Sequence, residues 1–429
     1  MVAPFVPDFD RVAGSLRFFT MLRILSREYR IIFLGHVRRE GERYVAALTS
    51  LGVEFHHAAI TNVESLLPQI ETGVLCEFYH EAEEILDIVR LVRGDLPIVV
   101  DSVDLHFVRQ SRAAPYAALP ARAERRALRT RRRELRVYRR ADAVIVVTET
   151  DKRTLLECMS DSRIAVVPTI HQEADEVPEF HDRTPNSLLF VGGFEHSPNV
   201  DAVLFFCREI LPLIRRSVAH VTVTIVGDCV PDEVQSLASA TVTVTGWVPD
   251  VKPYLHKHLV SIAPIRFGSG MKGKVAEAMA NGLPVVVTKI AAEGMELTDG
   301  VTALIADSAE EFADAVTRLL GDQALHGRLS TNGRHAARTR WSEAVVTEYL
   351  LALMRTLPQL TPQRLSVHRR GLAVIWLLLR KAGVHRLLRR LQARRILWVE
   401  VILQKKAGIR RRLRRLQALL EDRLPRKGN

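Results

Sequence analysis

The sequence has few cysteines, no long apolar run and no export signal. Its cysteines are scattered, and no two have the spacing of a zinc site or a redox pair: Cys76, Cys158, Cys207 and Cys229. The longest uncharged apolar run, Gly371 to Leu379, is about half the roughly 20 residues of a membrane-spanning helix. The N-terminal segment carries Asp8 and Asp10 in place of a basic stretch and an apolar core. These absences argue against a disulfide framework or a structural zinc site, and they predict a cytoplasmic chain without a membrane span.

Acidic residues are scarce at the C-terminal end. Residues 362–429 contain 20 Lys and Arg against 3 Asp and Glu, whereas the whole chain contains 61 against 49. Residues 1–361 therefore have 41 against 46, so the net charge of +12 combines a mildly acidic body at −5 with a basic tail at +17. Because the basic excess is confined to the tail, the charge does not favour a nucleic-acid-binding body, and the tail needs its own explanation.

Short apolar runs alternate with segments that have apolar residues at helical spacing. Such alternation is typical of βαβ units and predicts an α/β fold with two Rossmann-like domains built on parallel sheets. The runs in the first half are Ile31 to Leu34, Val53 to Ile60, Val74 to Tyr79, Ile98 to Val100, Ala143 to Val147 and Ile164 to Val167. Those in the second half are Leu188 to Val191, Val221 to Val226, Val242 to Val244, Val260 to Ile265, Val285 to Val287 and Ala303 to Ile305.

A polar stretch separates the two series of runs. His171 to Pro185 contains five acidic residues and two prolines, a composition that indicates an interdomain linker. We therefore predict an N-terminal domain at 1–172, a linker at 173–186 and a C-terminal domain at 187–357. A basic tail follows at 362–429. Ligands of such sheets bind at the carboxyl ends of strands.

The tail contains a tandem repeat. Arg369 to Ala393 and Arg394 to Ala418 are identical at 15 of 25 positions without a gap. Twenty-five residues make close to seven helical turns, so a continuous helix would return its apolar and basic faces to nearly the same side. Alternatively, Gly383 and Gly408 break each copy into a helical hairpin.

The stretch Ile262 to Thr288, IAPIRFGSGMKGKVAEAMANGLPVVVT, has the pattern of an anion site. A strand leads into a glycine-rich loop and then a helix predicted from about Met271 to Asn281. Such a loop lets backbone amides approach an anion, and the helix directs its N-terminal N–H groups at it. Positive charge lies beside this point, as a diphosphate requires, on Arg266, Lys272 and Lys274. Glu277 lies where a carboxylate accepts both hydroxyls of a ribose.

This stretch resembles the donor-binding segment of glycosyltransferase family 4, the group 1 glycosyl transferases, in its GSG-x-K-x-K form followed by EAMA-x-G-x-PVV. Four further segments agree with that family in order and spacing: Phe190 to Asn199, Val226 to Asp228, Gly246 to Val248 and Gly300 to Asp307. The resemblance covers residues 187 to 345 most strongly and implies a GT-B fold. In that fold residues 1–172 would form the acceptor-side domain and residues 187–357 the nucleotide-sugar donor-binding domain, whose last helix would cross back to the first domain. The donor contacts it implies are Gly193, Gly268, Ser269, Gly270, Met271, Lys274 and Glu277. Many members have a glutamate where this chain has Ser269.

The first half is similar to the same family over shorter segments. Asp8 to Arg17 resembles the glycine-containing first loop that faces the donor phosphates, with Gly14 and Ser15 as the matching positions. Asp101 to His106, DSVDLH, resembles the D-x-V-D-L-H segment at the interdomain cleft. The resemblance therefore implies that Asp101 and Asp104 line the cleft, and that His106 is the polar group nearest the reacting carbon. Arg122 to Arg140 is interpreted as a solvated helix of mixed charge.

The resemblance implies a hexosyltransferase-type enzyme that moves a sugar, with retention, from a nucleoside diphosphate sugar to a glycan or lipid-linked acceptor in cell-surface polysaccharide or glycolipid synthesis. It implies no metal site and no cofactor besides the nucleotide-sugar co-substrate. His106, Lys272 and Arg266 are the predicted catalytic residues, and the two cations would stabilise the departing phosphate. The alternatives are a catalytically inactive GT-B scaffold, which Ser269 would motivate, and a nucleotide-sugar epimerase or phosphorylase on the same fold.

The basic tail alternates arginine clusters with apolar clusters that include Trp376 and Trp398. Basic amphipathic helices of this kind lie in the interface of anionic membranes. We therefore predict peripheral attachment to the inner face of the cytoplasmic membrane through residues 362–429. The alternatives are packing on this protein or another subunit, and RNA binding, for which the aromatic residues are too few to form a stacking platform.

Overall fold

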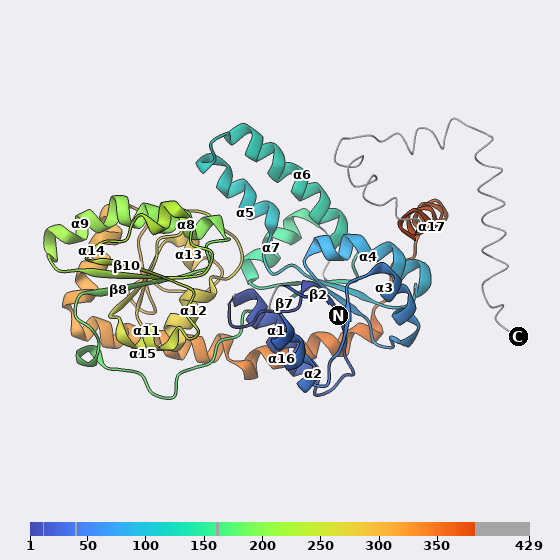
Figure 1. Ribbon diagram of the computed structural model, residues 1–429, viewed down its shortest axis with the longest axis horizontal. Coiled ribbons are helices and arrows are strands. Elements are labelled where there is room, and N and C mark those ends of the chain that lie inside the picture. The colour runs from blue at the N-terminus through green and yellow to red at the C-terminus, as the bar shows by residue number, and fades with distance from the viewer. Residues whose placement is uncertain (12, 39–40, 160–162, 382–429) are drawn as a thin grey trace, which may run out of the picture. The chain divides into compact units, whose positions relative to one another are not determined.

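The computed structural model describes residues 1–11, 13–38, 41–159 and 163–381. The chain divides into two compact units, Met1–Arg364 and Leu365–Asn429. The first unit contains two parallel sheets with helices packed on their faces (Figure 1). The predicted α/β fold with two Rossmann-like domains is therefore confirmed.

Seven parallel strands form the first sheet in the order β3-β2-β1-β4-β5-β6-β7. These strands are β1 Val2–Phe5, β2 Ile32–His36, β3 Glu54–His57, β4 Val74–Glu77, β5 Ile98–Asp101, β6 Ala143–Val146 and β7 Ile164–Val166. Its helices are α1 Ala13–Leu25, α2 Glu42–Ser50, α3 Ile60–Leu66, η1 Leu67–Gln69, α4 Tyr79–Val92, α5 His106–Ala113, η2 Ala114–Tyr116, α6 Pro120–Tyr138 and α7 Glu149–Cys158. The apolar runs of the first half correspond to β2 through β7.

Strand β1 was not predicted, although it lies at the centre of the sheet between β2 and β4. It includes Pro4, which has no N–H to donate, and its register with β2 shifts between Val2 and Phe5. A short run interrupted by proline is a weak strand pattern. The strand is held by its neighbours on both sides and by the complete burial of Ala3.

Six parallel strands form the second sheet in the order β10-β9-β8-β11-β12-β13. They are β8 Ser187–Val191, β9 Thr222–Val226, β10 Val242–Gly246, β11 Val260–Ala263, β12 Val285–Val287 and β13 Leu304–Ile305, which are the predicted runs. The helices are η3 Phe180–Asp182, α8 Ser197–Phe205, η4 Phe206–Ile210, α9 Leu211–Ser217, α10 Asp232–Gln235, α11 Lys252–Lys257, α12 Gly273–Ala280, α13 Lys289–Ala292, α14 Ala309–Gly321 and α15 Gln323–Trp341.

The helix after α15 returns to the first sheet. α16 (Glu343–Thr356), followed by η5 (Leu357–Gln359), contributes Val346 and Leu350 to the apolar core beneath the first sheet, and it packs beside α1 (Figure 1). The chain therefore crosses between the two domains twice. The two crossings are joined where the His171 N–H donates to the carbonyl of Trp341 at 2.9 Å.

The stretch predicted as a linker packs closely on the second domain. The guanidinium of Arg183 is buried and donates to the carbonyls of Leu255 and His258, at 2.8 Å each, and of Gly282 at 3.1 Å. Burial lowers the pKa of Arg183 to about 10. Hydrogen bonds to these carbonyls replace those that the guanidinium would make with water.

The second unit begins with α17 (Val367–Lys381), and the described part of the tandem repeat ends there. The remainder of the first copy, to Ala393, and the whole second copy, Arg394 to Ala418, lie outside the described residues. Over the ranges that the structure describes, no helix is both long and apolar enough to cross a membrane.

One buried ion pair joins three segments of the first domain. Arg17 of α1 donates to the Asp101 carboxylate at the end of β5 at 2.5 Å, and to the carbonyls of Val167 at 2.8 Å and Pro168 at 3.2 Å after β7. The side chains of Arg17 and Asp101 are 1% and 0% exposed. Removing one partner of a buried pair leaves an uncompensated charge away from water.

We expect Arg17→Ala to lower the free energy of unfolding by about 3–5 kcal/mol, because Asp101 loses its partner while it stays buried. Urea denaturation followed by circular dichroism measures this loss. Arg23→Ala is the matched control, since Arg23 lies in the same helix but pairs with Glu343 where both side chains are about 30% exposed. Its expected cost is below about 1 kcal/mol. Equal losses for the two variants would contradict the central role of Arg17.

Candidate functional site

The loop between β11 and α12 adopts a backbone that favours glycine at one position. Gly270 has a φ of +69°, and a Cβ there would lie 3.1 Å from the Cβ of Asp104. After this left-handed residue, α12 begins at Gly273 rather than at Met271, the predicted start. No side chain caps the helix, and its Val275 N–H donates to the Lys272 carbonyl at 2.9 Å, so the N–H groups of Gly273 and Lys274 are the ones that could meet an anion.

The two lysines of the loop are withdrawn from water. Lys272 is 9% exposed and its Nζ donates to the Gly270 carbonyl at 2.9 Å; burial lowers its pKa to about 8, against the opposing effect of Glu293 and Asp151. Burial is the main cause that lowers the pKa of Lys274 to about 7, and the positive charge of Lys272 lowers it further. Both ammonium groups would be stabilised by a bound anion.

Lys274 is held by a residue of α8 and a residue of β8. Its Nζ donates to Oδ1 of Asn199 and lies 4.4 Å from the ring centroid of Phe190. A Cβ on Gly192 would come within 2.6 Å of this Nζ, so a glycine at the end of β8 leaves room for the lysine. The next residue, Gly193, has open space around its Cα, and its carbonyl accepts from Asn199 Nδ2 at 2.6 Å.

Glu277 lies on α12 one turn beyond Lys274. Burial raises the pKa of its carboxyl to about 7, and the charge of Asp250 adds to this effect. Within the described ranges, no side chain or backbone N–H donates a hydrogen bond to this carboxyl. Its oxygens are therefore available to two neighbouring hydroxyls, as the sequence predicted for a ribose.

The end of β5 brings Asp104 against the glycine-rich loop. Ser269 Oγ donates to the carbonyl of Leu105 at 3.0 Å and lies 3.3 Å from Asp104 Oδ2. Arg109 donates to the same carboxylate at 2.6 Å. Ser269 thus joins the two domains at the position where many family members carry a glutamate.

The placement of Asp101 in the cleft was wrong. This carboxylate is fully buried beneath the β5–α5 loop, and it accepts from Arg17 and from the Val103 N–H. The sequence around an aspartate at a strand end does not reveal whether its side chain points into a cleft or into the protein interior. The partner that decides the matter, Arg17, lies 84 residues away.

His106 is the first residue of α5. Its N–H donates to Glu134 Oε1 at 3.1 Å, and its ring lies edge-on to Phe78 and Tyr79 with centroids at 5.7 and 5.3 Å. Nδ1 lies 3.1 Å from Asp104 Oδ1 but makes no hydrogen bond with the described residues. Burial lowers the pKa of His106, more than Asp104 raises it, and so favours the neutral ring.

Arg266 is engaged away from the lysines. Its guanidinium forms a two-point pair with Asp201, at 2.9 and 2.6 Å, and lies over the rings of Tyr116 and Phe205. The prediction that placed Arg266 beside the phosphates did not foresee this partner on α8.

The first loop also faces the cleft. Gly14 lies at the start of α1, where a Cβ would be 3.8 Å from Val103, and Ser15 Oγ donates to Asp8 at 2.7 Å. After the glycine-rich loop, Met271 Sδ accepts a hydrogen bond from Thr169 Oγ1 at 2.8 Å. The predicted donor contacts of both halves therefore gather around one interdomain edge.

Two residues that the sequence did not reveal also hold this edge together. Arg112 of α5 donates to the carbonyl of Gly268 at 2.9 Å and forms a two-point pair with Glu293 at 2.5 and 2.8 Å. Arg112 and Glu293 are 181 residues apart and belong to different domains. No local pattern links them, so only the fold identifies the pair.

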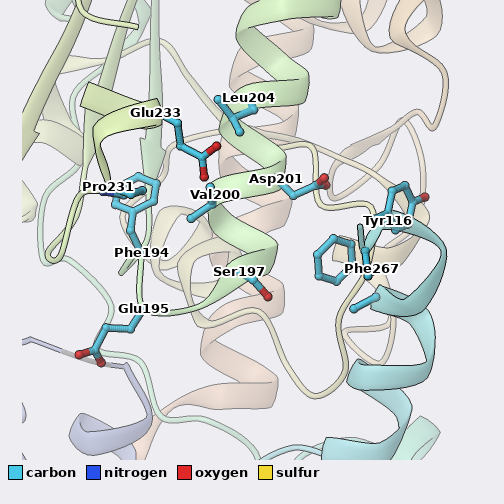
Figure 2. A pocket seen from close by; sticks show the side chains of 12 residues that line it. Tyr116, Phe194, Glu195, Ser197, Val200, Asp201, Leu204, Pro231, Glu233 and Phe267 are labelled. Carbon is cyan, nitrogen blue, oxygen red and sulfur yellow. The ribbon is translucent and has the colours of Figure 1, made fainter. Parts of the chain in front are cut away.

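A separate pocket of about 490 Å³ lies between η2 and α8 (Figure 2). Tyr116 and Phe267, whose stacked rings are 5.3 Å apart, line it together with Phe194 and the carboxylates of Glu195, Asp201 and Glu233. None of the predicted site residues lines this pocket. Phe267, which lines the pocket, directly precedes Gly268 of the glycine-rich loop.

Residues 185–322 match the family model of the glycosyl transferases group 1. The match runs from β8 through α14 and contains Gly193, the glycine-rich loop, both lysines and Glu277. The resemblance predicted from the motifs is therefore confirmed. No curated protein matches the chain in sequence.

Solved structures of low sequence identity share the fold. Sucrose-phosphate synthase from Thermosynechococcus elongatus is 14% identical with a TM-score of 0.63, over 83% of this chain and 98% of that chain. HepE of Anabaena, in complex with UDP and glucose, is 13% identical with a TM-score of 0.61, over 83% and 99%. A mutant of S. aureus TarM, in complex with Fondaparinux, alpha-GlcNAc-glycerol and UDP, is 14% identical with a TM-score of 0.55, over 68% of this chain. This chain spans 58% of TarM. The two-sheet architecture is the GT-B fold of these proteins.

Proposed function

We propose that the chain is a retaining, metal-independent glycosyltransferase that moves a sugar from a nucleoside diphosphate sugar to a glycan or lipid-linked acceptor. The arrangement of Lys272, Lys274 and Glu277 within the part that matches the family model carries this proposal. The buried ammonium group of Lys272, the half-buried one of Lys274 and the half-buried carboxyl of Glu277 are what a diphosphate and a ribose would bind. HepE and TarM, which share the fold, bind UDP, and this supports a nucleoside diphosphate here.

The chemical step breaks the bond between the anomeric carbon and a β-phosphate oxygen, and negative charge develops on that oxygen. Lys272 and the uncapped N–H groups of α12 would stabilise this charge in a site from which water is largely excluded. The departing phosphate then takes the proton of the acceptor hydroxyl, which attacks the carbon on the same face. His106, at the start of α5 and with Nδ1 3.1 Å from Asp104 Oδ1, would bind the sugar beside the reacting carbon.

The cation we assign to the phosphate is Lys272 rather than Arg266, because Asp201 already engages the guanidinium of Arg266. In the described ranges, no group of three or more His, Cys, Asp or Glu side chains could hold a metal ion. Metal independence stays part of the proposal, since the lysines could supply positive charge that a metal supplies elsewhere.

We also propose a cytoplasmic enzyme held at the membrane by residues 362–429, acting in cell-surface polysaccharide or glycolipid synthesis. The basic, Trp-containing tail supports this location. The main alternative is a catalytically inactive scaffold. Ser269 does not favour that alternative, because its hydroxyl already has a structural task between the two domains.

The donor site is tested by nucleotide binding. We expect one of the UDP-, GDP- and dTDP-sugars to raise the thermal midpoint of the purified chain without added metal. At about 100 times the dissociation constant, the gain is about 2.7 kcal/mol. Glu277→Ala should abolish the shift, and mass spectrometry of the complex identifies the nucleotide. Absence of binding by any of these donors to the folded wild type would favour the scaffold.

Turnover should depend on Lys272. Lys272→Ala is expected to reduce kcat about a hundred- to a thousandfold with whichever donor binds, because it removes charge stabilisation from the leaving phosphate. Steady-state kinetics and a thermal melt of the same sample separate this effect from unfolding. Lys289→Ala is the control, since its side chain is 80% exposed and pairs with Asp307. Wild-type turnover in Lys272→Ala would remove this residue from the mechanism.

The pH dependence of binding should differ between a nucleoside and its diphosphate. Glu277, whose pKa is about 7, must be ionised to accept the ribose hydroxyls, so affinity for uridine should rise with pH up to that value and then stay constant. Lys274 and Lys272, with pKa values of about 7 and about 8, must be protonated to bind a diphosphate. Affinity for UDP should therefore fall above these values, by about tenfold per pH unit for each lysine. Titration calorimetry measures both profiles, and identical profiles would exclude the lysines from the diphosphate site.

A further inference from the structure

The most strongly charged exposed surface outside the site lies on α6, the long helix that projects beside α5 (Figure 1). Residues 120–140 contain ten arginines and two glutamates. One of the glutamates, Glu134, is fully buried, so Glu124 alone contributes an exposed acidic group to this stretch. The segment is a largely exposed helix, as predicted, but its exposed charge is mostly positive rather than mixed.

Six arginines form what we call the basic face of α6. They follow one another at helical spacing, opposite the residues that pack on α5, and all are exposed. None of the six makes an ion pair or side-chain hydrogen bond with another residue of the described chain: Arg122, Arg125, Arg126, Arg129, Arg132 and Arg136. Neighbours that do find partners, such as Arg133 with Glu83 and Arg140 with Asp87, lie towards the body of the domain.

Apolar side chains are exposed on the same projection. Leu119, directly before α6, is 61% exposed, Leu128 on the helix is 51% exposed, and Tyr116 in η2 is 49% exposed. Leu128 is flanked by Arg129, Arg125 and Arg132 at one, three and four positions. Single exposed leucines need no explanation, but these lie close to six exposed arginines that have no ion-pair partner in the described structure.

We propose that α6 and the tip before it dock on an anionic lipid surface, as a contact separate from the basic tail. The arginines would lie at the level of the phosphate headgroups, while Leu119 and Leu128 would enter the boundary with the acyl chains. A polyanion such as RNA would satisfy the charge but not the leucines. Tyr116 is the sole exposed aromatic ring of the projection in the described structure, which is too little for base stacking.

Docking of α6 would also orient the site. The buried carboxylate of Glu134 on α6 accepts from the N–H groups of His106 and Phe107, at 3.1 and 2.9 Å. Tyr138 donates to the same carboxylate at 2.7 Å. The helix that would contact the lipid is therefore joined directly to the start of α5, and it would hold the interdomain cleft near an acceptor that is anchored in the membrane.

Vesicle flotation of the full chain tests the proposal. Vesicles that contain phosphatidylglycerol should bind the wild type, and phosphatidylcholine vesicles should not. Each basic residue near an anionic surface strengthens binding about fivefold, so reversing four charges should weaken it at least about a hundredfold. The variant combines Arg122→Glu, Arg125→Glu, Arg126→Glu and Arg129→Glu, and it keeps the tail unchanged.

The matched control reverses four exposed arginines of the second domain that have no ion-pair partner in the described structure: Arg208→Glu, Arg216→Glu, Arg318→Glu and Arg328→Glu. It changes the net charge equally and should retain most of the binding. Equal losses in the two variants, or wild-type binding by the α6 variant, would overturn the proposal. Leu119→Ser with Leu128→Ser should also weaken vesicle binding, whereas a loss of affinity for a single-stranded RNA alone would assign the helix to nucleic acid.

Hydrogen exchange gives a local readout that the tail does not influence. Peptides covering residues 117–129 should exchange more slowly with phosphatidylglycerol vesicles present, and unchanged exchange there would also overturn the proposal. The donor-induced thermal shift is independent of this surface and should be the same in the α6 variant and the wild type. A chain that binds nucleotide but not vesicles through α6 therefore keeps the proposed function and loses only this inference.

Discussion

The buried guanidinium of Arg17 is the constraint on which the first half of the site depends. It binds the end of β5 through Asp101 and the exit of β7 through Val167 and Pro168, while its own helix carries Gly14 and Ser15. These segments supply the face that meets the second domain. A single charge that cannot be exposed therefore fixes the relative positions of the first loop, the loop that carries Asp104 and His106, and the first crossing between domains.

The second half of the site is built on unfavourable burial. Lys272, Lys274 and Glu277 each have a pKa displaced towards the neutral form, because the surrounding chain excludes water without supplying enough opposite charge. Groups of this kind lower the stability of the empty protein and gain most from a ligand that carries the complementary charge and hydroxyls. The guanidinium of Arg17, in contrast, is buried with all its hydrogen-bond partners inside the protein, so it is not available to a ligand.

The parts of the fold and site that depend on local pattern were predictable from the sequence. Periodicity located β2 through β13, and the spacing of glycines and lysines located the loop before α12. The rest depends on contacts between distant segments. The burial of Asp101 was not foreseen because Arg17 lies 84 residues away. The pairs of Arg266 with Asp201 and of Arg112 with Glu293 span 65 and 181 residues. Strand β1 was missed because Pro4 breaks its pattern, although its neighbours determine its place.

The double crossing of the chain has a mechanical consequence. Because the crossings at His171 and Trp341 are joined by a backbone hydrogen bond, both are fixed at one end of the interface, and α16 belongs to the core of the first domain. Any rotation of one domain against the other would therefore turn about this paired segment. Contacts between the domains elsewhere, such as Trp247 with the carbonyl of Asp10 and Arg11 with Asp228, would have to separate for such a rotation. A rotation about the paired crossings would leave both hydrophobic cores intact, because neither core would have to be divided.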